Sequence, residues 1–410
     1  MDYEIIVIGG GPAGILAAGT AGSRGKKVLL IEKNEKLGKK LFITGKGRCN
    51  VTNASEMDEF MSNIPKNSKF LYSAFRTYSN HDLLAMLQDM GLQTKVERGG
   101  RVFPASDKSS DVLKALQKYL DKNNVKVMLN TAVREIHTAE EQICGVTLEN
   151  GDTLPCQSVI VCTGGLSYPQ TGSTGDGLEF AKAMGHTITD LFPSLIPLVV
   201  KEDYIKELQG LSLKNVAIKV LTDNKSIYED FGEMLFTHYG LSGPIILSGS
   251  FYISEHLKKK KNIKVLIDLK PALSEEELDK RVLRDFQQNQ NKHFKNALDA
   301  LLPQKLIPLI IRLVKIDENK EVNQISKEER KRLVLLLKGL EFTITGTRPI
   351  AEAIVTSGGV SLKEINPKTM ESKLIKGLYF AGEVMDLDAF TGGYNLQIAF
   401  STGYSAGMDA

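Results

Sequence analysis

A strand, a glycine-rich turn and a helix open the 410-residue chain and constrain its fold more than any other feature. Residues 3–8 are a short apolar run rich in β-branched side chains, which predicts a buried parallel strand. Gly9, Gly11 and Gly14 follow in the G-x-G-x-x-G spacing, directly before a helix-forming segment. In such a turn the backbone approaches a diphosphate closely, and the helix N-terminus favours its negative charge.

A second predicted strand, residues 27–31, ends at Glu32, eighteen residues after Gly14. A carboxylate at this point accepts hydrogen bonds from the ribose of an adenosine. A lone glycine triplet is weak evidence, because many turns contain one. The strand, triplet, helix, second strand and acid in register are much more specific. They predict that the N-terminal segment binds an ADP-containing dinucleotide.

The composition is that of a soluble globular protein, with 42% hydrophobic and 25% charged residues. No apolar run reaches the roughly 18 residues of a membrane span, and the chain begins with a core strand, so we expect neither a span nor a cleavable signal. The four cysteines form no CxxC pair, which argues against disulfide exchange and favours a reducing, cytoplasmic setting. The histidines show no metal-ligand spacing, so we expect no metal.

The middle of the first half mixes loops, helices and strands. Residues 33–53 are too rich in glycine and polar groups for a helix core, and they suit either a polar ligand or a solvated surface loop. Helices are predicted over 68–90 and 111–120, and strands over 125–129, 133–136, 143–148 and 158–162. The last of these strands ends in Thr163-Gly164-Gly165, where the glycines let the backbone approach a dinucleotide or simply turn a corner.

The pattern changes near residue 192. Short alternating segments predict an inserted antiparallel β module at 191–270, with a closing strand near 339–345. Amphipathic segments at 271–338 predict a helical cap. The nucleotide-binding domain is therefore expected in two parts, 1–190 and 345–410.

Positive charge is concentrated in the second half of the insert. Residues 257–340 carry 20 Lys and Arg against 12 Asp and Glu, an excess of +8, whereas the whole chain is only +3. Lys258–Lys261, here called the lysine run, supply half of this excess. Such runs are usually solvated turns.

The C-terminal part indicates which dinucleotide is bound. A final predicted strand closes on Gly382-Glu383, and Gly392-Gly393 open a last helix. Glu383 could accept a hydrogen bond from a ribityl hydroxyl, and the helix N-terminus could face the flavin N1/C2-oxygen edge, where charge grows on reduction. An NAD enzyme usually binds its nucleotide with one contiguous unit, so this return of the chain favours FAD.

Three stretches resemble the signatures of a bacterial group, the HI-type or aminoacetone-oxidase-like FAD flavoproteins: residues 38–40 with 48–53, 236–244, and 391–397. Residues 3–32 with Gly382-Glu383 also resemble the glutathione-reductase-type FAD fold. The resemblance implies an α/β fold, a Rossmann-like FAD domain with an inserted β module and a helical cap, and noncovalent FAD. It says little about substrate, because members are linked to small amino ketones, activated double bonds of steroids and a uridine of ribosomal RNA. Lys46 departs from a loop that is often all glycine in this group.

The predicted cofactor site draws on four parts of the chain. Its residues are Gly9, Gly11, Pro12, Ala13, Gly14, Glu32 and Lys33; Lys40, Arg48, Cys49 and Asn50; Val133, Thr163, Gly164 and Gly165; and Gly382, Glu383, Gly392, Gly393, Asn395 and Leu396. Tyr168, Thr171, Ser173 and Asp176 are expected to line the same cleft.

Three residues are candidates for catalysis. His238, which the sequence places at the junction of the β module and the cap, suits proton transfer, and a structural histidine at a helix start is the alternative. Arg48 is expected to contact an anion of the cofactor or substrate. Cys49 could donate a proton to a reduced double bond, with Arg48 and Asn50 favouring a thiolate; a plain loop cysteine is the alternative.

The leading functional hypothesis is an FAD-dependent oxidoreductase that transfers hydride between noncovalent FAD and a small amine, ketone or activated double bond. No second G-x-G-x-x-G unit is present, so NAD(P)H would visit the flavin transiently, or oxygen would reoxidise it. One alternative is a ribosomal RNA uridine reductase that docks through the basic cap, although positive charge by itself does not specify RNA. The other is a flavin-binding protein without turnover.

Overall fold

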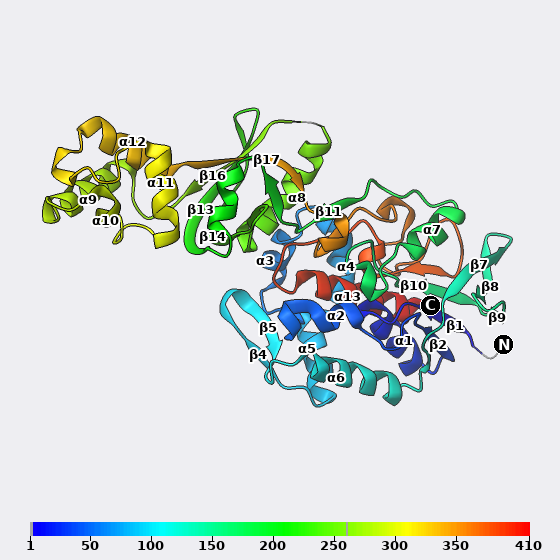
Figure 1. The fold of residues 1–410 in the computed structure, drawn as a ribbon. Helices are drawn as coiled ribbons and strands as arrows, with labels where there is room; N and C mark the ends of the chain where they lie inside the picture. The colour runs from blue at the N-terminus through cyan, green and yellow to red at the C-terminus, as the bar shows by residue number, and fades with distance from the viewer. Residues whose placement is uncertain (1–2, 260) are drawn as a thin grey trace. The chain divides into compact units, whose positions relative to one another are not determined.

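The computed structural model describes residues 3–259 and 261–410, which divide into two units (Figure 1). The first unit comprises Met1–Ser194 and Ile350–Ala410, and the second comprises Leu195–Pro349. The boundaries predicted from the sequence lie at 190/191 and 344/345. Each unit has its own hydrophobic core.

A five-stranded parallel sheet forms the centre of the first unit, in the order β19-β10-β1-β2-β6. The strands are β1 (Ile5–Ile8), β2 (Val28–Ile31), β6 (Lys126–Met128), β10 (Ser158–Val161) and β19 (Leu378–Phe380). Every residue of β1 and β2 is buried, because helices cover both faces of such a sheet and the strands are apolar throughout. The C-terminal strand β19 pairs with β10, so the end of the chain completes the sheet that its start begins.

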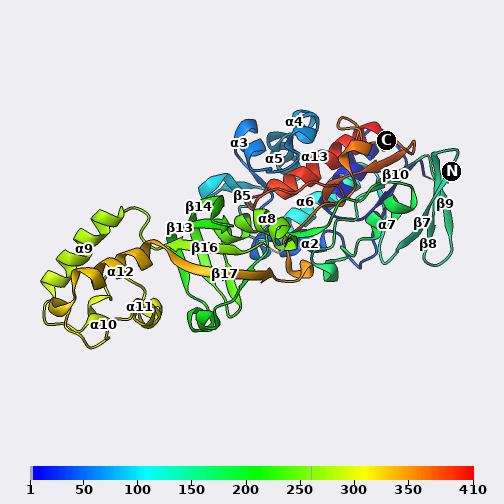
Figure 2. The same ribbon diagram turned by 90° about the horizontal axis from the view of Figure 1, so that it is seen from above.

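Two helices, α1 (Pro12–Ser23) and α13 (Tyr394–Asp409), lie against each other in both views (Figures 1 and 2). Small residues make this close packing possible. A Cβ atom at Gly403 would lie 2.2 Å from the carbonyl oxygen of Ala13, and one at Gly407 would lie 2.3 Å from that of Ala17. The packing brings the last helix of the chain beside the first.

Smaller elements surround this centre. The helices are α2 (Lys39–Ile43), α3 (Met57–Ser62), α4 (Tyr72–Thr77), α5 (Asn80–Asp89), α6 (Ser109–Lys122) and α7 (Asp176–Ala183). The strands are β3 (Thr52–Asn53), β4 (Thr94–Val96), β5 (Arg101–Pro104), β7 (Val133–Ala139), β8 (Gln142–Leu148), β9 (Thr153–Pro155), β11 (Phe192–Ser194) and β18 (Val355–Ser357).

Local details differ from the sequence analysis in the first unit. The single helix expected over 68–90 is broken, because the backbone at Tyr78 is extended. Ser79 then caps the N-terminus of α5 in a capping box with Asp82. A short helix, α2, lies inside the expected loop 33–53.

The second unit is a closed barrel with strand order β12-β15-β14-β13-β16-β17. The sequence predicts an antiparallel β module here but not that its strands close into a barrel. Its strands are β12 (Leu198–Val200), β13 (Ser212–Thr222), β14 (Lys225–Phe236), β15 (Gly240–Ser242), β16 (Ile263–Asp268) and β17 (Leu340–Thr347). Its helices are α8 (Pro244–Lys258), α9 (Glu275–Gln288), α10 (Phe294–Ala297), α11 (Ile307–Val314) and α12 (Lys327–Lys338). Within this unit α9 to α12 gather at one end of the barrel (Figures 1 and 2).

The segment near residue 192 belongs to the first unit. β11 pairs antiparallel with β18, which is also in the first unit, so the expected β module begins only after Ser194. Among residues 3–259 and 261–410, no helix is long and apolar enough to cross a membrane.

Candidate cofactor site

The turn between β1 and α1 forms an open cradle. Gly9 has φ +104°, and a Cβ there would lie 2.5 Å from the carbonyl oxygen of Cys162, while a Cβ at Gly14 would lie 1.9 Å from that of Gly9. These two positions need glycine so that the helix can approach the sheet. Gly11 is different, because no described residue other than Gly11 itself and its neighbours along the chain has an atom within 4 Å of a Cβ built there. The space in front of Gly11 is free for a ligand.

The N-terminus of α1 is suited to an anion. No side chain in the described part of the chain caps it, and its first turn contains no acid. The helix begins with the hydrogen bond from the Ile15 N–H to the Gly11 carbonyl oxygen, 2.9 Å long, and Pro12 occupies the first position. The first N–H groups of a helix have no acceptor within it, and the helix dipole attracts negative charge to them.

Glu32 is fixed at the end of β2 with its side chain turned to the glycine turn. Its Oε2 accepts from the Gly10 N–H at 2.8 Å, and its Oε1 accepts from the Asn34 backbone N–H at 2.8 Å and from Asn34 Nδ2 at 2.6 Å. The residue is 8% exposed. The next residue, Lys33, forms an ion pair of 2.7 Å with Asp176. The carboxylate expected to recognise a ribose is thus held in one orientation by its neighbours.

Two of the signature stretches meet at the N-terminus of α13. A Cβ at Gly393 would lie 2.3 Å from the carbonyl oxygen of Thr52, so the backbones are in close contact. Thr52 Oγ1 donates to Gln397 Oε1 at 2.7 Å, and Asn53 Nδ2 donates to the Gly392 carbonyl oxygen at 3.1 Å. Sequence reasoning did not select Thr52, Asn53 or Gln397 as site residues, although all three lie in the signature stretches.

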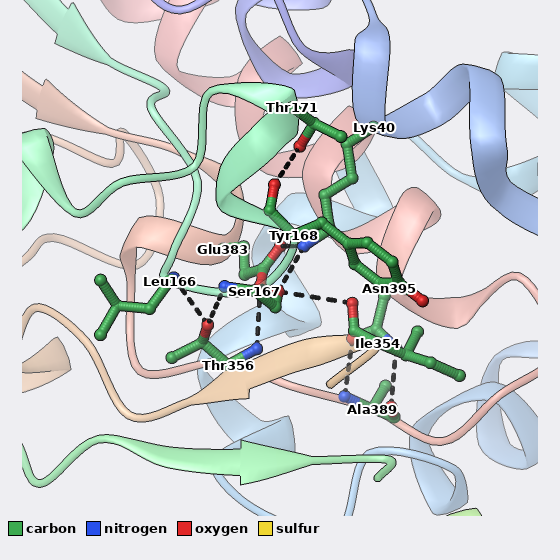
Figure 3. A network of polar contacts seen from close by, with 10 residues as sticks. All are labelled: Lys40, Leu166, Ser167, Tyr168, Thr171, Ile354, Thr356, Glu383, Ala389 and Asn395. Carbon is green, nitrogen blue, oxygen red and sulfur yellow. Dashed lines mark hydrogen bonds and ion pairs between the residues drawn. The ribbon is translucent and has the colours of Figure 1, made fainter. Parts of the chain in front are cut away.

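The N-terminus of α13 is a second open helix end. Gly393 precedes it with φ +101°, and within the described ranges no side chain caps it. Asn395 binds the preceding loop: its Oδ1 accepts from the Ala389 N–H at 2.9 Å and its Nδ2 donates to the Ala389 carbonyl oxygen at 2.7 Å (Figure 3). Asn395 therefore fixes the backbone next to the helix end.

A polar network centred on Glu383 joins four distant segments (Figure 3). Glu383 Oε2 accepts from Lys40 Nζ at 2.7 Å. Glu383 Oε1 accepts from Ser167 Oγ and from the Thr356 N–H, both at 2.9 Å. Thr356 Oγ1 accepts from the Leu166 N–H at 2.8 Å. Lys40 and Glu383 were selected from the sequence, whereas Ser167 and Thr356 carry no sequence signal of their own.

The structure gives Arg48 other partners than an anionic ligand. Its guanidinium donates to Asp107 at 2.8 Å and to Glu97, and it lies 4.1 Å from the ring centroid of Phe103. Hydrogen bonds with Glu97 and then with Asp107 raise the pKa of Arg48. Both carboxylates neutralise the guanidinium, so the expectation that Arg48 would promote a thiolate at Cys49 is corrected.

Cys49 lies in the core of the first unit and is 0% exposed. Burial raises the pKa of its thiol to about 12, against a smaller lowering by the hydrogen bond with Thr44. At neutral pH the thiol is therefore protonated, and a role for Cys49 is confined to the neutral form.

His238 belongs to the second unit and lies in the turn between β14 and β15. This position is within the barrel, neither at a junction with the helical cap nor at a helix start. The side chain is exposed, and its ring lies 4.8 Å from that of Tyr239 in an edge-on arrangement. Tyr239 in turn lies beneath the Arg348 guanidinium, 4.7 Å from it.

The remaining predicted residues lie in the first unit. A Cβ at Gly164 would lie 2.8 Å from Ser173 Oγ, and one at Gly165 would lie 3.2 Å from Glu383 Oε1, so this turn packs against the Glu383 network. Val133 begins β7 and is buried. Ala13 lies in the first turn of α1 and Leu396 in the first turn of α13, whereas Asn50 lies between α2 and β3.

These features fit FAD. A diphosphate fits the open space at Gly11 and the uncapped end of α1, a ribose fits Glu32, and a flavin that gains charge on reduction fits the uncapped end of α13. A parallel sheet carrying this cradle defines an FAD-binding flavoprotein with a Rossmann-type domain.

The family model described as HI0933-like protein Rossmann domain matches residues 3–409, and the chain belongs to this family. It is 32% identical over 410 residues to the 3-dehydro-bile acid delta(4,6)-reductase of Clostridium scindens, covering 99% of this chain and 98% of that protein. It is 33% identical over 409 residues to the ribosomal RNA dihydrouridine synthase of Haemophilus influenzae, with the same two coverages of 99% and 98%.

Solved structures show the same fold. The 3-ketosteroid delta1-dehydrogenase of Sterolibacterium denitrificans aligns with a TM-score of 0.54 at 14% identity, covering 99% of this chain and 98% of that one. The predictions of the family, the α/β FAD fold and an FAD-dependent oxidoreductase are confirmed.

Proposed function

We propose that this oxidoreductase reduces a carbon–carbon double bond conjugated to a carbonyl group. The observation that carries the redox part is the pair of open helix ends in one unit, α1 and α13, which suit a diphosphate and a flavin that becomes negatively charged. When bound and reduced, FAD supplies a hydride. The substrate class is supported by what the relatives' names share. A 3-dehydro bile acid with 4,6 double bonds and the uracil ring of uridine are both conjugated carbonyl compounds.

Reduction of such a bond also needs a proton at the carbon next to the carbonyl. Cys49 could supply this proton only as a neutral thiol, since burial raises its pKa to about 12. His238, which belongs to the second unit, stays a prediction from the sequence.

The first experiment asks whether the protein carries FAD and what it reduces. One sample of the protein is denatured to release the flavin. A second, holoprotein reduced anaerobically with NADH or NADPH, is mixed with a conjugated enone or a saturated ketone, and a third, oxidised holoprotein, is mixed anaerobically with a simple amine. We expect FAD in the supernatant, reoxidation of the reduced flavin by the enone alone, and no reduction of the oxidised flavin by the amine. Reduction by the amine, reoxidation by the saturated ketone, or no reoxidation by the enone contradicts the proposed substrate class.

Ribosomal RNA uridine is the second candidate substrate, because two relatives that match almost the whole chain carry that name. The lysine run gives this candidate little support. Lys259 pairs with Glu255 at 2.6 Å and Lys261 pairs with Asp223 at 2.8 Å, so these charges are compensated locally. Lys260 lies outside the described residues. We therefore place the small conjugated carbonyl compound first, and dihydrouridine analysis of ribosomal RNA from a strain lacking the gene separates the two.

A further inference from the structure

The ion pair between Lys40 and Glu383 joins residues that are 343 positions apart in the chain. Lys40 Nζ also donates to Ser167 Oγ at 2.6 Å (Figure 3). The side chains of Lys40 and Glu383 are 21% and 19% exposed, whereas Ser167 is fully buried. The pair is thus sheltered by protein on the side of Ser167 and accessible on another.

The pair keeps unused hydrogen-bonding capacity. Glu383 Oε1 already accepts from Ser167 and Thr356, which fills its two acceptor positions, whereas Oε2 accepts from Lys40 alone among the described residues. In the part of the chain that the structure describes, the Lys40 ammonium uses two of its three N–H donors. One acceptor position and one donor therefore remain on atoms 2.7 Å apart. A ligand hydroxyl, which both donates and accepts, is the group that matches them.

The pair lies beside the two helices with open ends. Gly382 directly precedes Glu383, and a Cβ at Gly382 would lie 3.0 Å from Ala13 Cβ of α1 and 3.7 Å from Ala399 Cβ of α13. A dinucleotide that extends from the N-terminus of α1 to the N-terminus of α13 would lie close to this point. Its polyol chain lies between the diphosphate and the flavin ring, so hydroxyl groups are the part expected there.

We infer that Lys40 is a positioning residue for the flavin. It neutralises Glu383 and offers its remaining N–H to a hydroxyl of the FAD polyol chain, so that the flavin takes up electrons beside a neutral pair. Without Lys40 the flavin would be reduced beside an uncompensated carboxylate, which opposes added negative charge in a partly buried site. Without Glu383 it would be reduced beside an uncompensated ammonium, which favours it. This inference rests on FAD binding in the first unit and on no particular substrate.

The test is the reduction potential of the bound flavin in Lys40→Met, Glu383→Gln and the double variant, measured by equilibration with a reference dye. At a fixed dye potential we expect the ratio of reduced to oxidised flavin to fall about tenfold in Lys40→Met and to rise about tenfold in Glu383→Gln, where tenfold equals about 30 mV for a two-electron couple. The double variant should return towards the wild-type ratio. A purely structural role would not give shifts of opposite sign that cancel.

Two controls match the charge change. Lys39→Met removes a lysine of the same helix whose partner is Glu35, at 3.1 Å, and should leave the potential unchanged. Lys40→Arg keeps the charge and should also retain the wild-type potential. Titration of FAD into apoprotein should give a higher Kd for Lys40→Met than for Lys39→Met. This measurement tests the positioning role even if a variant loses its cofactor during purification.

Two outcomes overturn the inference. One is a shift of the same sign, or no shift, in the two single variants; the other is equal FAD affinity in Lys40→Met and Lys39→Met together with an unchanged potential. A wild-type protein without FAD would refute the cofactor assignment and with it this inference. Failure of the enone assay would refute only the proposed substrate class.

Discussion

The buried carboxyl of Asp388 makes the stability of the first unit depend on pH in an unusual direction. Asp388 is 1% exposed in the loop before α13, and it accepts from Ser194 Oγ at 2.7 Å and from Ser357 Oγ at 3.0 Å. Burial raises its pKa from the ordinary 3.8 to about 6, with a further contribution from Asp386, and the two serine hydrogen bonds oppose this rise.

The sign follows from linkage between protonation and folding. Because the folded protein holds the Asp388 proton more tightly than the unfolded chain does, the stabilisation is present below the unfolded pKa of 3.8 and is lost as pH rises through the folded pKa of about 6. A shift of this size corresponds to about 3 kcal/mol of unfolding free energy lost by neutral pH. Asp388 therefore contributes in the opposite direction from an ordinary paired carboxylate.

Asp388→Asn removes this ionisation. We expect the unfolding free energy of the variant, relative to wild type, to increase by about 1.5 kcal/mol between about pH 5 and pH 8, whatever constant difference the amide introduces. The measurement is urea unfolding followed by circular dichroism at several pH values, with both proteins saturated with FAD. A difference that stays flat, or decreases as pH rises, would refute the reasoning.

Ser194→Ala provides the matched control. It removes a hydrogen bond that favours the charged form of Asp388, so its destabilising effect should grow with pH when Asp388 is present. In the Asp388→Asn background the same substitution should cost an amount independent of pH. An equal pH dependence in both backgrounds would assign the effect to another group.

Three further predictions concern the glycine turn, Lys46 and the lysine run. Gly11→Val should abolish FAD binding but lower the free energy of unfolding of the apoprotein by only about 1 kcal/mol, because the added side chain occupies ligand space and meets no protein atom. Gly14→Val should destabilise the fold itself, because its side chain would meet backbone atoms. Thermal unfolding of both apoproteins tests this difference. Lys46 has a φ of +58°, so Lys46→Gly should raise the free energy of unfolding by about 0.5–1 kcal/mol. Lys114→Gly, inside α6, should instead lower it by about 1 kcal/mol, and urea unfolding measures both. Exchange of the lysine run for Gln should change neither the FAD content nor the slope of log affinity for ribosomal RNA against log salt. A slope that becomes shallower by about three would instead show that the run docks RNA.

Local sequence patterns were enough to predict the structure at the start of the chain. Four-residue apolar runs can be buried on both faces only in a covered parallel sheet, and β1 and β2 are fully buried. The spacing of Gly9 and Gly14 predicted a tight glycine turn, and the structure agrees, since any side chain at either position would meet backbone atoms. Lys46 was noted because the similar group often has glycine in this loop, and the structure shows the reason, a left-handed φ of +58° that favours glycine.

The partners of individual side chains, in contrast, depend on the folded chain. Sequence patterns report local periodicity and backbone preference, whereas an ion pair depends on which distant segments the fold brings within about 3 Å of each other. Arg48 was expected at a ligand and is instead neutralised by Glu97 and Asp107. Lys40 meets Glu383 only because β19 returns to the central sheet, and Asp388 has a raised pKa only because the surrounding chain excludes water from it.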